Sequence, residues 1–280
     1  MEDLINGGVG FMNFADFFIT PSNYKTFNTQ ILRQNAIIFC QTDYIDFLFE
    51  NLRFSNRKYI LITHFSDYHI DEAKFLRKPN CIKKWFALQT TYEHPDLIQI
   101  PAGFGVFWDK FQNPNELYQK WFFDNVKSLR SSEKNNEIVY CNYRSDYMRP
   151  WRYSVVDKIQ SSGVNCYVPP DKNTISGRLI FPDYCEDMSK FKFIASPPGN
   201  GGLDAHRNWE AIYMGCIPIV IKNLIYKNYD LPILQVNKYT EVTNELLSNY
   251  LEFYKTHEFN YEHVKLSYWT NMMSEYLKNS

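Results

Sequence analysis

A glycine-rich turn followed by a charged helix is the part of this sequence best suited to chemistry. An apolar run ends at Ala195, the turn occupies residues 196–202 (SPPGNGG), and a helical pattern runs from about Asp204 to Met214. Such a turn exposes backbone N–H groups, and the positive end of the following helix points at whatever the turn binds. We therefore predict an anion site. Because the turn lacks the Lys-Ser/Thr ending of a P-loop, we do not expect a Walker-type ATP site.

Three charged side chains follow the turn at a spacing that suits a nucleotide sugar. His206 and Glu210 are four residues apart and share one face of the helix, and Arg207 flanks them near its start. We expect Arg207 to hold a diphosphate, Glu210 to bind ribose hydroxyls, and His206 to contact a phosphate or cap the turn. A surface ion pair between Arg207 and Glu210 is the alternative. The predicted donor site also includes four residues of the turn: Ser196, Gly199, Asn200 and Gly201.

These residues carry a resemblance to a known protein family. The stretch from Ser196 to Val220 resembles the signature of exostosin-like glycosyltransferases. Shorter similarities extend the match to residues 61–67, 85–87, 94–95, 98–103 and 140–144. The chain is most similar to the compact stand-alone members of large DNA viruses of algae, and unlike the larger members we expect it to have no N-terminal membrane anchor or stem.

The resemblance implies a fold and a reaction. Members of the family have the GT-B fold, an α/β architecture in which two Rossmann-like domains face each other across a cleft. Their last helix crosses back to the N-terminal domain. They are inverting enzymes that transfer a sugar from a nucleotide to a hydroxyl group of a glycan or glycoprotein. The resemblance implies a UDP-sugar donor. Of the sugars plausible in such a family, which include xylose, glucuronate and galactose, we expect xylose.

Apolar runs that alternate with helical patterns predict parallel sheets in both halves of the chain. In the first half the expected strands are residues 36–40, 59–63, 85–88 and 97–100. The polar segment 131–136 is the most linker-like. We therefore expect an N-terminal acceptor-side domain over residues 1–133, a nucleotide-sugar-binding domain over 134–260, and a C-terminal helix over 261–280 that packs back on the first domain.

Glycosyl transfer also needs a group that stabilises the departing diphosphate and a base for the acceptor hydroxyl. The Asp-x-Asp motif, with which many transferases of the other major fold hold a metal, is absent, so we expect no metal and no other cofactor. Arg144, just after an expected strand, is a second candidate for the diphosphate. For the base we expect Asp67, with His64 as the alternative, because both follow a buried strand at the rim where ligands bind.

Composition and charge argue against several other classes of protein. The net charge is −1 with no sustained basic block, so we expect no nucleic-acid partner. The six cysteines are scattered without the spacing of a zinc site. With no signal peptide and no apolar stretch of about 18 residues, we expect no transmembrane segment and a soluble cytoplasmic protein, in the setting of a virus-infected host cell.

Two other functions fit the same features. A non-catalytic module that binds nucleotide sugars or carbohydrate needs the donor site but no base. A GT-B-like sugar-nucleotide epimerase needs the donor site but no acceptor, and it converts the sugar of the donor alone.

Overall fold

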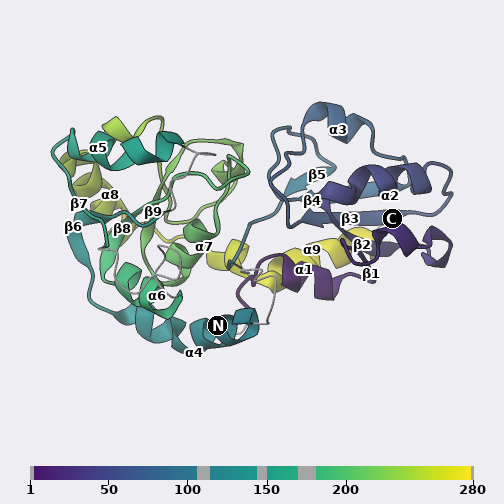
Figure 1. Cartoon of the computed structure of the whole chain (residues 1–280), viewed down its shortest axis with the longest axis horizontal. Coiled ribbons are helices and arrows are strands. Elements are labelled where there is room, and N and C mark those ends of the chain that lie inside the picture. Colours follow the sequence, from purple (N-terminus) through teal and green to yellow (C-terminus); the bar gives the residue numbers. More distant parts are fainter. Residues whose placement is uncertain (1–2, 106–113, 144–149, 170–180, 279–280) are drawn as a thin grey trace.

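Two parallel β-sheets form the framework of the protein. The computed structural model describes residues 3–105, 114–143, 150–169 and 181–278, and over them each sheet has five strands (Figure 1). The first sheet contains β1 (Phe17–Ile19), β2 (Ala36–Gln41), β3 (Tyr59–His64), β4 (Ile82–Ala87) and β5 (Leu97–Gln99). The second contains β6 (Asn135–Tyr140), β7 (Asn165–Tyr167), β8 (Phe191–Ala195), β9 (Ile217–Ile221) and β10 (Leu234–Val236). Neighbouring strands pair in parallel in both sheets, which confirms the α/β class and the two Rossmann-like sheets expected of a GT-B fold.

Helices pack on each sheet, and a sheet with its helices is called a unit below. The first unit contains α1 (Gly8–Phe14), α2 (Ile45–Leu52), α3 (Glu72–Leu76) and α9 (Leu266–Lys278) (Figure 1). The second contains α4 (Pro114–Ser131), α5 (Ser154–Gln160), α6 (Phe181–Ser189), α7 (His206–Tyr213) and α8 (Asn244–Thr256). Among the described helices, none combines the length and the apolar character that crossing a membrane requires.

The strand order of the first sheet explains why the C-terminal helix returns to it. Its strands lie in sequence order, β1-β2-β3-β4-β5. Each connection between neighbouring parallel strands is right-handed, and in this sheet every connection leads to the next strand in the same direction. The connecting helices α2 and α3 therefore cover the same side of the sheet (Figure 1). The other side carries Phe39, Ile62 and Phe86, which pack with Phe11 of α1 and with Trp269 and Met273 of α9. The expected crossing of the last helix to the N-terminal domain is confirmed.

The second sheet has a different order, β10-β9-β8-β6-β7. The chain moves from β6 outward to β7 and then returns to place β8 on the other side of β6. Such a reversal is a topological switch point, where the loops after the two central strands diverge and leave a crevice that binds ligands in α/β proteins. Of the two described sheets, only the second has one.

Helix α4 packs on the second sheet. Its residues Phe122 and Val126 share a core with Tyr140 of β6 and with Met188 of α6. The predicted domain boundary after residue 133 falls just beyond this helix, and the exact division stays a prediction. The packing nevertheless places α4, which precedes that boundary, with the second unit.

Candidate functional site

Arg207 lies at the switch point of the second sheet. Its Nε donates to the carbonyl oxygen of Asn142, after β6, at 3.0 Å, and its Nη1 donates to that of Pro197, after β8, at 3.4 Å. The guanidinium carbon lies 5.7 Å from the centre of the Tyr143 ring. The half-buried arginine therefore joins the two diverging loops. Its partners are carbonyl oxygens and not the Glu210 carboxylate, so the alternative of an ion pair is not realised.

A second arginine, which we did not predict, reaches the same turn. Arg152 belongs to a short 3-10 helix (Pro150–Tyr153) and is buried. Its guanidinium donates to the carbonyl oxygen of Pro198, next to the carbonyl that Arg207 contacts. Two cations therefore converge on the first part of the glycine-rich turn. Arg152 is distant in sequence from the turn, and its surroundings give no pattern that marks it as a site residue.

Three buried hydroxyl groups lie near the switch point of the second sheet. Ser196 Oγ and the hydroxyls of Tyr143 and Tyr239 have no hydrogen-bond partner among the described residues. Burial raises the pKa of both tyrosines, while the positive charge of Arg207 acts in the opposite direction on each. The phenols therefore stay protonated and can donate a hydrogen bond. Because buried polar groups in folded proteins are nearly always paired, unpartnered donors beside two cations indicate a place for an anionic ligand.

The glycine-rich turn is folded on itself. Gly199 N donates to the carbonyl oxygen of Asp204 at 3.2 Å, and a Cβ at Gly199 would lie 2.7 Å from that same oxygen. Gly202 has φ +79, a left-handed conformation that favours glycine. Asn200 is exposed at the tip of the turn. The glycines are therefore needed for the close return of the chain to the start of α7.

Loops of the first unit press against this turn. A Cβ at Gly201 would lie 2.8 Å from the Gln89 side chain and 3.3 Å from the Asp67 carbonyl oxygen. The His69 ring pairs with the Gly201 carbonyl oxygen. Gln89 accepts from Asp204 N at 3.2 Å and donates to the Asp204 carbonyl oxygen at 3.4 Å. The rims of the two sheets therefore meet at residues 199–204.

The Asp204 side chain ties these parts together and was not among the predicted site residues. The carboxylate is buried and accepts hydrogen bonds from both units. One oxygen, Oδ2, accepts from Ala102 N at 3.0 Å and from Trp209 Nε1 at 2.8 Å. The other, Oδ1, accepts from Ala205 N, Asn208 Nδ2 and the Tyr226 hydroxyl at 2.8–3.0 Å. A single carboxylate thus fixes the start of α7 to the segment that leaves the first sheet.

His206 and Glu210 contact the same segment of the first unit. His206 Nδ1 pairs with the Gly103 carbonyl oxygen at 2.9 Å. Glu210 is 2% exposed, and its oxygens accept from Gly105 N at 3.2 Å and from the Tyr184 hydroxyl at 3.0 Å. Burial raises the Glu210 pKa, and the nearby His206 partly opposes that rise. Each carboxylate oxygen accepts from one protein donor, and the ribose-binding role of Glu210 stays a prediction.

The two predicted bases lie in different surroundings. Asp67 is exposed on the loop after β3, beside Gly201. His64 is buried at the end of β3, where Nδ1 accepts from Phe65 N at 2.8 Å and Nε2 lies 3.4 Å from the Pro101 carbonyl oxygen. Burial, with a smaller contribution from His206, lowers the His64 pKa to about 3. Both ring nitrogens of His64 are engaged, and the choice of Asp67 as the base stays a prediction.

Two further expectations concern the diphosphate and stay predictions. Arg144 lies outside the described residues. Within the described ranges, no group of three or more His, Cys, Asp or Glu side chains is placed to hold a metal ion.

A groove with a volume of about 440 Å³ is lined by residues of both units. Its lining includes Tyr92, His94 and Gln99 of the first unit and Asn228 of the second. An ion pair of 2.8 Å between Glu93 and Lys227 links the two sides.

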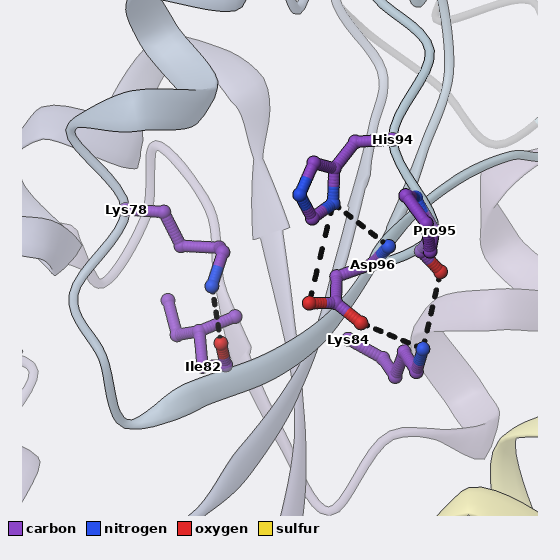
Figure 2. Close-up of polar contacts among 6 residues, drawn as sticks. All are labelled: Lys78, Ile82, Lys84, His94, Pro95 and Asp96. Atoms are coloured by element: carbon purple, nitrogen blue, oxygen red, sulfur yellow. Dashed lines mark hydrogen bonds and ion pairs between the residues drawn. The ribbon is translucent and has the colours of Figure 1, made fainter.

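The His94 loop, which forms one wall of the groove, is held in place by polar contacts (Figure 2). His94 Nδ1 accepts from Asp96 N at 3.0 Å, and Lys84 Nζ donates to Asp96 Oδ1 at 2.7 Å and to the Pro95 carbonyl oxygen at 3.1 Å. The hydrogen bond from Lys84 lowers the Asp96 pKa. These contacts join the His94 loop to Lys84 of β4.

Eight chains among solved structures match this chain in fold. No protein-family model matches the sequence, and no curated protein matches it. Among solved structures, the chain is similar to one described as "Crystal Structure of alpha1,3-Fucosyltransferase", with 12% sequence identity and a TM-score of 0.48 over 98% of this chain and 85% of that one. A likeness of this degree carries no argument about the activity, and the exostosin-like family stays a prediction.

Proposed function

We propose that the protein is an inverting glycosyltransferase that transfers a sugar from a nucleoside diphosphate to a hydroxyl group of a glycan or glycoprotein. The observation that carries this proposal is the position of Arg207 at the switch point of the second sheet. Arginine is suited to phosphate recognition because its planar guanidinium presents several donors in a fixed geometry. The buried hydroxyls of Ser196, Tyr143 and Tyr239 add further donors. UDP is the carrier that we propose, and UDP-xylose is the donor to be tested first.

In this proposal the leaving diphosphate is stabilised by the protein without a metal. Arg207 has five N–H groups, and the two contacts to Asn142 and Pro197 leave donor capacity for phosphate oxygens. The start of α7 adds partial positive charge. Negative charge grows on the diphosphate as the glycosidic bond breaks, so donors fixed in advance at this point lower the barrier.

Asp67 is the proposed base. It is exposed on the rim of the first unit, on the loop that touches the donor turn at Gly201. An inverting transfer needs a carboxylate or imidazole that removes the proton of the acceptor hydroxyl as that oxygen attacks the sugar. His64 is unsuited to this role because both of its nitrogens are engaged.

The groove between the units is the proposed place of the acceptor. Its charged pair, Glu93 and Lys227, is mutually neutralised, and its lining offers the Tyr92 ring together with the amides of Gln99 and Asn228. Aromatic rings and amides suit the apolar faces and hydroxyls of an uncharged glycan. Thr90 lines the groove and follows Gln89, which contacts the donor turn, so the first unit connects the groove with that turn.

The first experiment is calorimetric titration of the protein with UDP, UDP-xylose and other nucleotide sugars in the presence of a chelator. We expect UDP to bind, and Arg207→Ala to weaken the affinity by about 10–100-fold, the effect of losing charged hydrogen bonds. Arg53→Ala removes an exposed arginine of the first unit and should leave the affinity unchanged. Absence of nucleotide binding, or binding that depends on a divalent ion, contradicts the proposal.

A second experiment separates the alternative functions. The donor is incubated alone and with a panel of glycans, using the wild type and Asp67→Asn. Loss of transfer by Asp67→Asn with unchanged UDP affinity supports the proposed base. Conversion of the sugar without an acceptor identifies an epimerase instead, and nucleotide binding without any turnover identifies a binding module.

A further inference from the structure

A second groove, at the opposite edge of the second sheet from the donor site, gathers positive charge. It has a volume of about 400 Å³, and four basic residues line it: Arg130, Lys134, Lys192 and Lys255. No Asp or Glu is among the described residues of its lining. This basic groove lies where β6, β8 and β9 begin, whereas the donor turn follows the end of β8. The five residues of β8 separate the two edges by about 13 Å.

Lys134 is held at the ends of two helices. Its Nζ donates to the carbonyl oxygens of Leu129 and Arg130 in the last turn of α4, at 3.1 and 3.3 Å. It also donates to the carbonyl oxygen of Ser189, the last residue of α6, at 3.1 Å. Burial lowers the Lys134 pKa, and the positive charges of Lys192 and Arg130 act in the same direction. The neighbouring cations therefore repel one another, and a negative charge between them would relieve that repulsion.

Lys192 and Arg130 are placed by a carbonyl oxygen and by aromatic rings. Lys192 Nζ donates to the Gly215 carbonyl oxygen, just after α7, at 3.0 Å and lies 3.6 Å from the centre of the Tyr254 ring. The Arg130 guanidinium carbon lies 5.0 Å from the centre of the Tyr261 ring. An aromatic face attracts a cation but carries no net charge. These contacts position both cations and leave their charge in place.

The positive charge of the basic groove is only partly balanced. Helices α4, α6 and α7 end beside it, and each helix end carries about half a negative charge. Lys255 pairs with Glu252 at 2.7 Å. Glu252 and the other acidic neighbours in sequence, Glu133 and Glu137, are exposed and lie outside the lining, where water and salt screen them. Within the groove the four cations therefore outweigh the helix ends.

We propose that the basic groove is a second anion site, which binds the phosphate group of a ligand other than the sugar donor. Arginine and lysine bind phosphate through charge-assisted hydrogen bonds. A phosphate monoester carries about −1.5 to −2 charge near pH 7, which suits several cations better than the single charge of a sulfate ester. Pockets that hold small molecules have volumes of about 300–1,000 Å³, so the groove has room for the molecule that carries the phosphate. The proposal does not depend on the proposed function.

The test is calorimetric titration of the full-length protein with glucose 6-phosphate, glucose 6-sulfate and glucose. We expect glucose 6-phosphate to bind more tightly than the sulfate, and glucose not to bind. The double variant Arg130→Gln with Lys255→Gln should weaken the binding of the phosphate by about tenfold or more. The matched control, Lys83→Gln with Lys127→Gln, removes the same charge at exposed residues outside the lining and should bind as the wild type does.

A sugar phosphate can also enter the proposed donor site, and Arg207→Ala separates the two. We expect this variant to keep its affinity for glucose 6-phosphate. Loss of that binding in Arg207→Ala, with unchanged binding in the double variant of the groove, places the probe at the donor site and overturns the proposal. The proposal is also overturned if the wild type does not bind the phosphate, if the matched control weakens binding equally, or if the sulfate binds as tightly as the phosphate. The comparison of the two double variants decides the question even if Arg207→Ala does not fold.

Discussion

Substitution of Asp204 by Asn is expected to lower the free energy of unfolding by about 2–5 kcal/mol. The buried carboxylate accepts from a backbone N–H on each oxygen, Ala102 N on Oδ2 and Ala205 N on Oδ1. An amide has only one oxygen, so either orientation of Asn turns its own N–H groups against a backbone donor. One buried donor left without a partner costs about 1–3 kcal/mol. The hydrogen bonds that remain also lose the negative charge that strengthens them.

Urea unfolding, followed by tryptophan fluorescence and circular dichroism, measures this difference. Asp67→Asn is the matched control, because Asp67 is exposed and a surface change of this kind alters stability by about 0.5 kcal/mol or less. Since Ala102 belongs to the first unit, its amide should also exchange hydrogen faster in Asp204→Asn. A variant whose stability lies within about 0.5 kcal/mol of the wild type, with Ala102 still protected, would refute the role that we assign to the carboxylate.

Three other substitutions give distinct outcomes. Burial raises the folded-state pKa of Glu210 above 4.5, so its contribution to stability is complete below pH 4.5 and is lost as the pH rises through the folded-state pKa. In urea unfolding between pH 4.5 and 8, Glu210→Gln should remove the decrease in the free energy of unfolding that ionisation of Glu210 causes. The folded-state pKa of His64 is about 3 against an ordinary 6.5, so its contribution to the free energy of unfolding is complete above pH 6.5 and is lost as the pH falls toward 3. In the same measurement, His64→Gln should reduce the loss of stability between pH 6.5 and 3. Met273→Ala leaves a cavity between α9 and the first sheet and should cost about 2–5 kcal/mol in urea unfolding.

The long buried strands and the charged helix could be predicted because their sequences carry the pattern by themselves. All six residues of β3 are buried, and a continuous apolar run is what a strand covered on both faces requires. Helix α7 was predicted from about 204 to 214 and spans His206–Tyr213, followed by Gly215 in a left-handed conformation. In contrast, β1 and β10, with three residues each, were not predicted, and pairing with a neighbouring strand defines them. Short length is not the whole reason, because the equally short β5 lies within the predicted strand 97–100.

The N-terminal glycines show a different limit. Gly8 and Gly10 both lie in α1. A Cβ at Gly8 would lie 2.7 Å from the His64 and Phe65 rings, and one at Gly10 would lie 2.9 Å from the Leu266 side chain of α9. These glycines allow α1 to approach β3 and α9 closely. A contact between residues so distant in sequence leaves no local pattern.

The candidate site also contains residues that the sequence predicts and residues that it does not. Arg207 and the turn form one continuous segment, so a single stretch of sequence predicted them together. Arg152 and Tyr239 come from short 3-10 helices on other connections of the sheet. They reach the switch point only because the strand order brings the ends of several connections together. These two residues could be assigned to the site from the sequence only if the strand order of the second sheet were already known.

The strand orders of the two sheets explain why the chemistry is divided between the units as it is. A sheet in sequential order has all its crossovers on one face, so the first sheet has no switch point and must take its second cover from α1 and from α9 at the other end of the chain. It can therefore contribute only loops at its rim, and these are the segments that hold Gly201 and Asp204. The second sheet reverses at β6 and opens a crevice for an anion. The Trp269 ring of α9 also meets the Tyr229 ring of the second unit, with the ring centres 6.3 Å apart. Loss of α9 packing should therefore disturb the contact between the units as well as lower the stability of the first sheet.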